Sequence, residues 1–156
     1  MAYQSSDVRA VFAAADAVAA DPDGLAQSQT PSGSGNLTLN GALTSGGVGT
    51  FVSSRQITIT STGNISNRTF TITGTDVSGA VLGVVITGPN AATVTTSEHF
   101  RTITQISISG AAAAAVTAGM NGNAIEVITT GRARIKGAFI VNSANAGTVS
   151  FVDTAT

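Results

Sequence analysis

Apolar and polar residues alternate in short runs from residue 36 to the end of the chain. In each run, aliphatic or aromatic residues occupy every second position and Thr, Ser, Asn or Glu lies between them. Side chains of a strand point alternately to its two faces, so this period predicts strands with one face in a core. The pairs expected to face inward include Leu37 and Leu39, Ile57 and Ile59, Phe70 and Ile72, Ile106 and Ile108, and Ile125 and Val127.

Turn-forming sequences separate these runs roughly every ten residues, a spacing typical of all-β domains. They are Gly46-Gly47, Thr62-Gly63-Asn64, residues 76–79, Gly88-Pro89-Asn90, Asn121-Gly122 and Ala146-Gly147. Residues 36–156 are therefore predicted to form one β-sandwich or jelly-roll-like barrel of about 8–10 strands. Within it, the uninterrupted apolar run of residues 81–86 predicts a central strand that is covered on both faces.

The first 24 residues show a different period and predict one N-terminal helix. Ser5 or Ser6 caps it, and Asp21-Pro22-Asp23-Gly24 ends it, because a proline disfavours helical geometry in the residue before it. Residues 25–35 are polar and predict a linker or extended arm. The helix carries an apolar stripe that needs a covering surface, and we expect a protein interface at Val8, Val11, Phe12, Ala15 and Val18.

The composition adds that the chain carries little charge. The chain is 42% hydrophobic but only 10% charged, with a net charge of −1 and no cysteine. Acidic and basic residues are spread along it, so neither a nucleic-acid nor a membrane partner is expected. A weakly charged surface is poorly protected against association, which favours a protein that assembles with its own copies.

Catalytic and metal-binding patterns are missing. His99 is the only histidine, and no serine lies in a Gly-x-Ser-x-Gly sequence. The carboxylates are far apart in sequence, which gives no sign of the close pair that a glycosidase requires. Asp21-Pro22-Asp23-Gly24 resembles the opening of a calcium loop, but Ser32 stands where a bidentate glutamate is needed. We therefore predict no enzyme activity, no cofactor and no metal, and interpret His99 as a strand-edge residue.

Three basic residues alternate near the C-terminus. Arg132, Arg134 and Lys136 would line one face of a strand. Two interpretations stay open for them: an edge strand that uses charge to block unwanted pairing, or a contact with an acidic surface of a neighbouring subunit. We include them among the candidate interface residues.

Several stretches resemble the small Thr/Gly-rich virion proteins of tailed bacteriophages. The resemblance lies in RQITITSTGN at residues 55–64, FTITGTDVSG at 70–79, TGPNAATV at 87–94 and FRTITQI at 100–106. It implies a structural virion protein that is assembled in the host cytoplasm, most simply a capsid decoration or cement protein. Implied partners are further copies of itself, as in a trimer, and the major capsid protein or another virion protein. The alternative is a tail, collar or head-fibre module that contacts host surface glycans.

Overall fold

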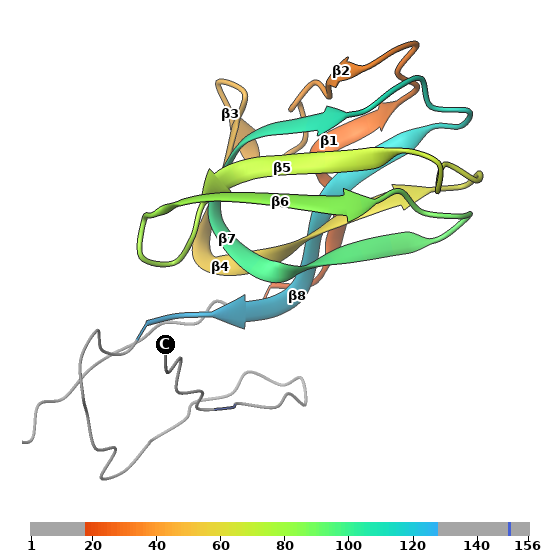
Figure 1. The fold of residues 1–156 in the computed structure, drawn as a ribbon. Coiled ribbons are helices and arrows are strands. Elements are labelled where there is room, and N and C mark those ends of the chain that lie inside the picture. The colour runs from red at the N-terminus through yellow and green to blue at the C-terminus, as the bar shows by residue number, and fades with distance from the viewer. Residues whose placement is uncertain (1–17, 128–149, 151–156) are drawn as a thin grey trace, which may run out of the picture.

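The strands that the structure describes belong to one antiparallel sheet (Figure 1). A computed structural model describes residues 18–127 and Ser150. The strands are β1 (Asp21–Gln29), β2 (Gly35–Asn36), β3 (Thr44–Ser45), β4 (Val48–Ser61), β5 (Thr69–Thr75), β6 (Val81–Thr87), β7 (Thr93–Ile108) and β8 (Val116–Ile125). Their order is β1-β8-β4-β7-β5-β6, with β2 beside β7 and β3 beside β4. The predicted all-β class is confirmed.

Bending of the long strands folds this sheet over. The first half of β7 pairs only with β4, whereas its second half, from Thr102 to Ile108, pairs with β5. The ladder between β4 and β7 shifts register twice, between Thr50 and Arg55 and between Gln56 and Thr58. Such bulges bend strands and increase their twist. Figure 1 shows β7 curling between its two halves, so that one face of the sheet closes around an interior.

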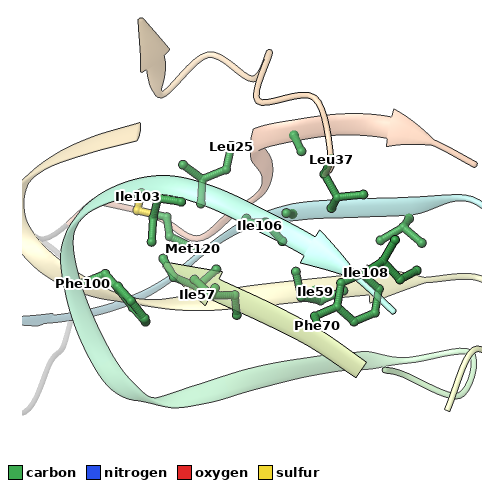
Figure 2. Close-up of a cluster of buried hydrophobic side chains, with 14 of the residues drawn as sticks. Leu25, Leu37, Ile57, Ile59, Phe70, Phe100, Ile103, Ile106, Ile108 and Met120 are labelled. Atoms are coloured by element: carbon green, nitrogen blue, oxygen red, sulfur yellow. The ribbon is translucent and has the colours of Figure 1, made fainter. Parts of the chain in front are cut away.

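The core contains the six residues for which the alternation is clearest. Ile57, Ile59, Phe70, Ile72 and Ile106 are fully buried, and Ile108 is 3% exposed. Figure 2 labels all of them except Ile72, together with Phe100 and Ile103, which extend the cluster into the bend of β7. Burial of each large aliphatic or aromatic side chain contributes about 1.5–3 kcal/mol. The predicted inward face of these strands is therefore confirmed.

Thr58 departs from this pattern, since alternation places it on the outer face but only 6% of it is exposed. It lies opposite Gly119 of β8. The backbone of Asp21 and Pro22 passes so close to Gly119 that a Cβ there would overlap the Asp21 carbonyl. The start of β1 thus covers the outer face of the sheet at this point.

The predicted division of the N-terminal region is wrong where the structure describes it. Residues 21–24 begin β1 instead of ending a helix, and residues 25–29 continue this strand instead of forming a linker. The reason is burial: Leu25 and Ala26 are fully buried, and the Leu25 side chain lies over Gly49. Val18 to Ala20 have no regular secondary structure. The remaining predicted helix, residues 1–17, lies outside the described residues.

Candidate interaction site

Of the predicted interface residues, the structure describes Val18 alone. It precedes β1 and is 41% exposed. The other members of the apolar stripe (Val8, Val11, Phe12 and Ala15) and the basic residues Arg132, Arg134 and Lys136 lie outside the described residues. The structure thus brings none of these predicted contacts together, and they stay predictions.

Val18 lies at a small pocket with an accessible volume of about 110 Å³. Pockets for drug-sized ligands usually have about 300–1,000 Å³. Arg55 lines the pocket and is 2% exposed, and its Nη1 donates to the Gly122 carbonyl at 3.0 Å. The pocket is also lined by Leu43, Thr50, Phe51, Val52 and Met120. The pocket is too small for such a ligand.

His99 lies on the first half of β7, opposite Gln56 of β4. The other side of this half-strand faces no strand of the described part of the chain, in keeping with a strand-edge histidine. Burial lowers the pKa of His99, and the charge of the neighbouring Glu98 opposes this shift. The imidazole is therefore held toward its neutral form.

The carboxylates of the described residues include one member of an ion pair and two residues of strand β1. Glu126 forms an ion pair with Arg101, at 2.7 Å between Oε1 and Nη2. Asp21 and Asp23 lie in β1, in place of the calcium loop considered from the sequence. Residues 18–127 contain no group of three His, Cys, Asp or Glu side chains placed to hold a metal ion. The same part of the chain has no helix of membrane-spanning length and apolarity.

The strand β6 carries the most exposed apolar surface of the described body. Among the described strands it is the last in the sheet order and pairs only with β5, so within this part of the chain the prediction of a central strand is wrong. On its outer face, Val81 is 85% exposed and Val85 is 64% exposed. Leu82, Val84 and Ile86 point the other way and pack against the core cluster. The run is apolar on both faces although one face has no cover among the described residues.

No device that usually protects an edge strand is present in β6. Natural edges are blunted by charged residues, prolines, bulges or shortness. β6 is seven residues long, reads VLGVVIT, and pairs with β5 without a register shift. It therefore offers a regular, uncharged edge on which another strand can pair.

The turn before β6 fixes the geometry of this edge. Asp76 Oδ1 accepts hydrogen bonds from the Ser78 hydroxyl at 2.7 Å, the Ser78 amide at 2.8 Å and the Ala80 amide at 2.9 Å. The Ser78 hydroxyl is the main cause of a lowered Asp76 pKa, and backbone donors add to it. Gly79 has a φ of 87°, which favours glycine at this position. The hairpin is thus held by a carboxylate-centred turn.

Comparisons with protein-family models, with curated proteins and with solved structures found no match.

Sequence reasoning found the apolar run of β6 but assigned it the wrong place. A continuous apolar strand is typical of a position with cover on both faces. The apolar run predicts that both faces of the strand are buried, but it does not predict which segment or molecule buries them. The lack of charge in the run is the signal that sets it apart from most exposed edge strands.

Proposed function

We propose that this chain is a structural virion protein of a tailed bacteriophage, and specifically a capsid decoration or cement protein that binds and stabilises the head. One observation carries the proposal from the structure: the body ends in a regular, apolar edge strand that is free of charge. Such an edge suits a protein whose surface becomes covered on assembly. The resemblance to Thr/Gly-rich virion proteins supplies the setting, and implies a trimer bound to the major capsid protein.

The alternative, a tail, collar or head-fibre module for host glycans, takes second place on composition and burial. Glycan-binding surfaces present exposed aromatic side chains that stack on sugar rings. The aromatic residues of the described part of the chain are Phe51, Phe70 and Phe100, which are at most 5% exposed. Residues 18–127 therefore offer no aromatic platform, and the decoration role is preferred.

The proposal is tested by adding the purified protein to phage heads that lack it. Saturable co-sedimentation with heads, and a higher temperature of DNA release from the decorated heads, are the expected results. Cryo-electron microscopy of the virion should then show the protein on the capsid lattice. Location at a tail tip or collar, together with no binding to heads, would replace this function by the alternative.

We propose in addition that the apolar stripe of residues 8–18 anchors the subunit to its neighbours in the particle. Deletion of residues 1–17 leaves β1 intact, because β1 begins at Asp21. The shortened protein is expected to keep the cooperative unfolding of the full chain and to lose head binding. A shortened chain that fails to fold would place the stripe in the core of its own domain, and one that binds heads normally would remove the anchor.

A further inference from the structure

Among the described residues no strand pairs with the outer edge of β6, and the backbone groups along this edge can be identified. The Asp76 amide donates to the Ala80 carbonyl, and the Gly88 amide donates to the Arg68 carbonyl. Between these two bonds the hairpin pairs residue for residue, and hydrogen-bonded and non-bonded pairs alternate in an antiparallel ladder. Leu82, Val84 and Ile86 therefore bond to β5. The outward N–H and C=O groups belong to Val81, Gly83, Val85 and Thr87.

We propose that this edge pairs with β6 of a second copy of the chain, antiparallel and around a two-fold axis at Val84. Strand addition to an exposed edge is an established mode of protein recognition. A two-fold axis at Val84 aligns all seven residues of both strands. It also sets every outward residue opposite another outward residue, Val81 against Thr87 and Gly83 against Val85, as hydrogen-bonded pairs require.

Side-chain size supports this register. Gly83 lies in the middle of the strand, where a glycine weakens the ladder or marks the close approach of another chain. Its backbone shows no positive φ and no bulge, and a Cβ there would meet nothing within 4 Å. The fold of one copy therefore does not require glycine at this position. In the two-fold pairing, Gly83 leaves room for the exposed Val85 of the second copy.

Charge does not oppose this contact. β6 has no charged residue, so no like charges meet along it. At the two ends of the hairpin, the Asp76 carboxylate accepts from Ser78 and Ala80, and Arg68 Nε donates to the Ala111 carbonyl just after β7. The direction of the pairing therefore rests on the register and on side-chain size.

A contact between two edge strands buries a small area, so it is expected to be weak by itself. Seven residues a side cover less than the roughly 800 Å² per partner of a standard stable interface, so a weak dimer is expected in solution. On a particle, where each subunit is also held by another contact, the same pairing would be strengthened by effective concentration. The inference stands on the strand geometry and does not depend on the virion role.

Cysteine cross-linking tests the axis directly, because the chain has no cysteine of its own. In the proposed register Val84 faces Val84 of the other copy in a non-hydrogen-bonded pair, with Cα atoms about 4.5 Å apart. This separation lies within the range that a disulfide spans. Mild oxidation of V84C at micromolar concentration should therefore give a covalent dimer, at least about tenfold faster than the exposed control V52C. Cross-linking of V84C no faster than V52C would overturn the proposal, as would preferential cross-linking of G83C, which indicates another register.

Edge-blocking variants test whether the pairing drives assembly. V85K and G83P should each raise the dissociation constant of the dimer by about tenfold or more, since a charge or a proline blocks an edge. The Gly83 amide points outward, so G83P removes no bond to β5, and circular dichroism and thermal unfolding check that the body stays folded. V52K, at an exposed position of β4, is the matched control and should keep the wild-type mass in sedimentation.

A two-fold contact produces assemblies with an even number of copies. Sedimentation or mass photometry should show dimers, or paired trimers if a separate three-fold contact also forms. A lone trimer, or a mass that V85K and G83P leave unchanged, would overturn the pairing. These outcomes are separate from the proposed function, because head binding is measured independently of the cross-link.

Discussion

The hydroxyl of Thr96 replaces part of the β4–β7 ladder by accepting a hydrogen bond from the Ile57 amide at 2.9 Å. It donates in turn to the Glu98 carbonyl at 2.8 Å. Thr96 is 1% exposed and lies where the register shifts between Gln56 and Thr58. One buried side chain therefore satisfies both a donor of β4 and an acceptor of the bulge in β7, and this bulge helps to fold the sheet over.

Replacement of Thr96 by valine should destabilise the protein by about 1–3 kcal/mol. Valine preserves the shape of the side chain but leaves the Ile57 amide buried without a partner, and such groups incur their full desolvation cost. T96S is the control, since it keeps the hydroxyl. Urea unfolding at neutral pH measures both variants, and equal stability of T96V and wild type would show that the bulge does not depend on this bond.

The same substitution at Thr58 should have the opposite sign. The Thr58 hydroxyl is buried and has no hydrogen-bond partner among the described residues. T58V removes an unsatisfied polar group at constant shape, so it should be neutral or stabilising by up to about 1 kcal/mol. A clear decrease in the free energy of unfolding in urea would instead reveal a hydrogen-bond partner for the hydroxyl. T71V, at an exposed position of β5, serves as the control for a change on the surface.

Asp76 should make the stability of the protein depend on pH in the acid range. Its pKa in the folded state lies below the usual value of 3.8, chiefly because of the Ser78 hydroxyl. The stabilisation is therefore complete above that value and is lost as pH falls through the lowered pKa of the folded state. D76N keeps an acceptor oxygen and should reduce this dependence in unfolding curves taken between about pH 5 and pH 2. A pH profile identical to wild type would contradict the role of the carboxylate.

His99 should contribute a second, separate dependence near neutral pH. Burial lowers its pKa below the usual value of 6.5, and the charge of Glu98 opposes this shift. The unfolded chain therefore binds the proton more readily than the folded one. Stability should be full above about pH 6.5 and should decrease as pH falls from there toward the folded pKa. Because the chain has one histidine, its ring resonances can be followed in an NMR titration without assignment. An apparent pKa above 6.5 would contradict this, and H99Q should remove the dependence.

Local periodicity predicts the buried faces of the strands and one of the turns. Alternation identified the buried faces of β4, β5 and β7, and Gly46-Gly47 marked the turn of the β3–β4 hairpin, where φ is 59° and 77°. These features depend on neighbouring residues only. They could be predicted because a strand with one buried face has few ways to arrange its side chains.

Features that depend on distant segments were missed. β1 contains Pro22 and Gly24 and has just two adjacent apolar residues, Leu25 and Ala26, so no period marks it as a strand. It is a strand because it pairs with β8, nearly a hundred residues later. The edge position of β6 is likewise a property of the sheet order, which alternation does not encode. The candidate site was predictable as an apolar run and not as an edge.

The pairing of β1 with β8 has a kinetic consequence. Residue 21 meets residue 120, so the first strand of the described body has no ladder partner until the last one has been synthesised. Closing so long a loop slows folding, although β1 also has local hydrogen bonds from the Gly41 and Leu43 amides. The β5–β6 hairpin is local and needs no such wait, so its uncharged edge is presented early, while the rest of the sheet is incomplete. Slow refolding at high concentration should therefore lose material to aggregation, and V85K, which protects that edge, should raise the yield.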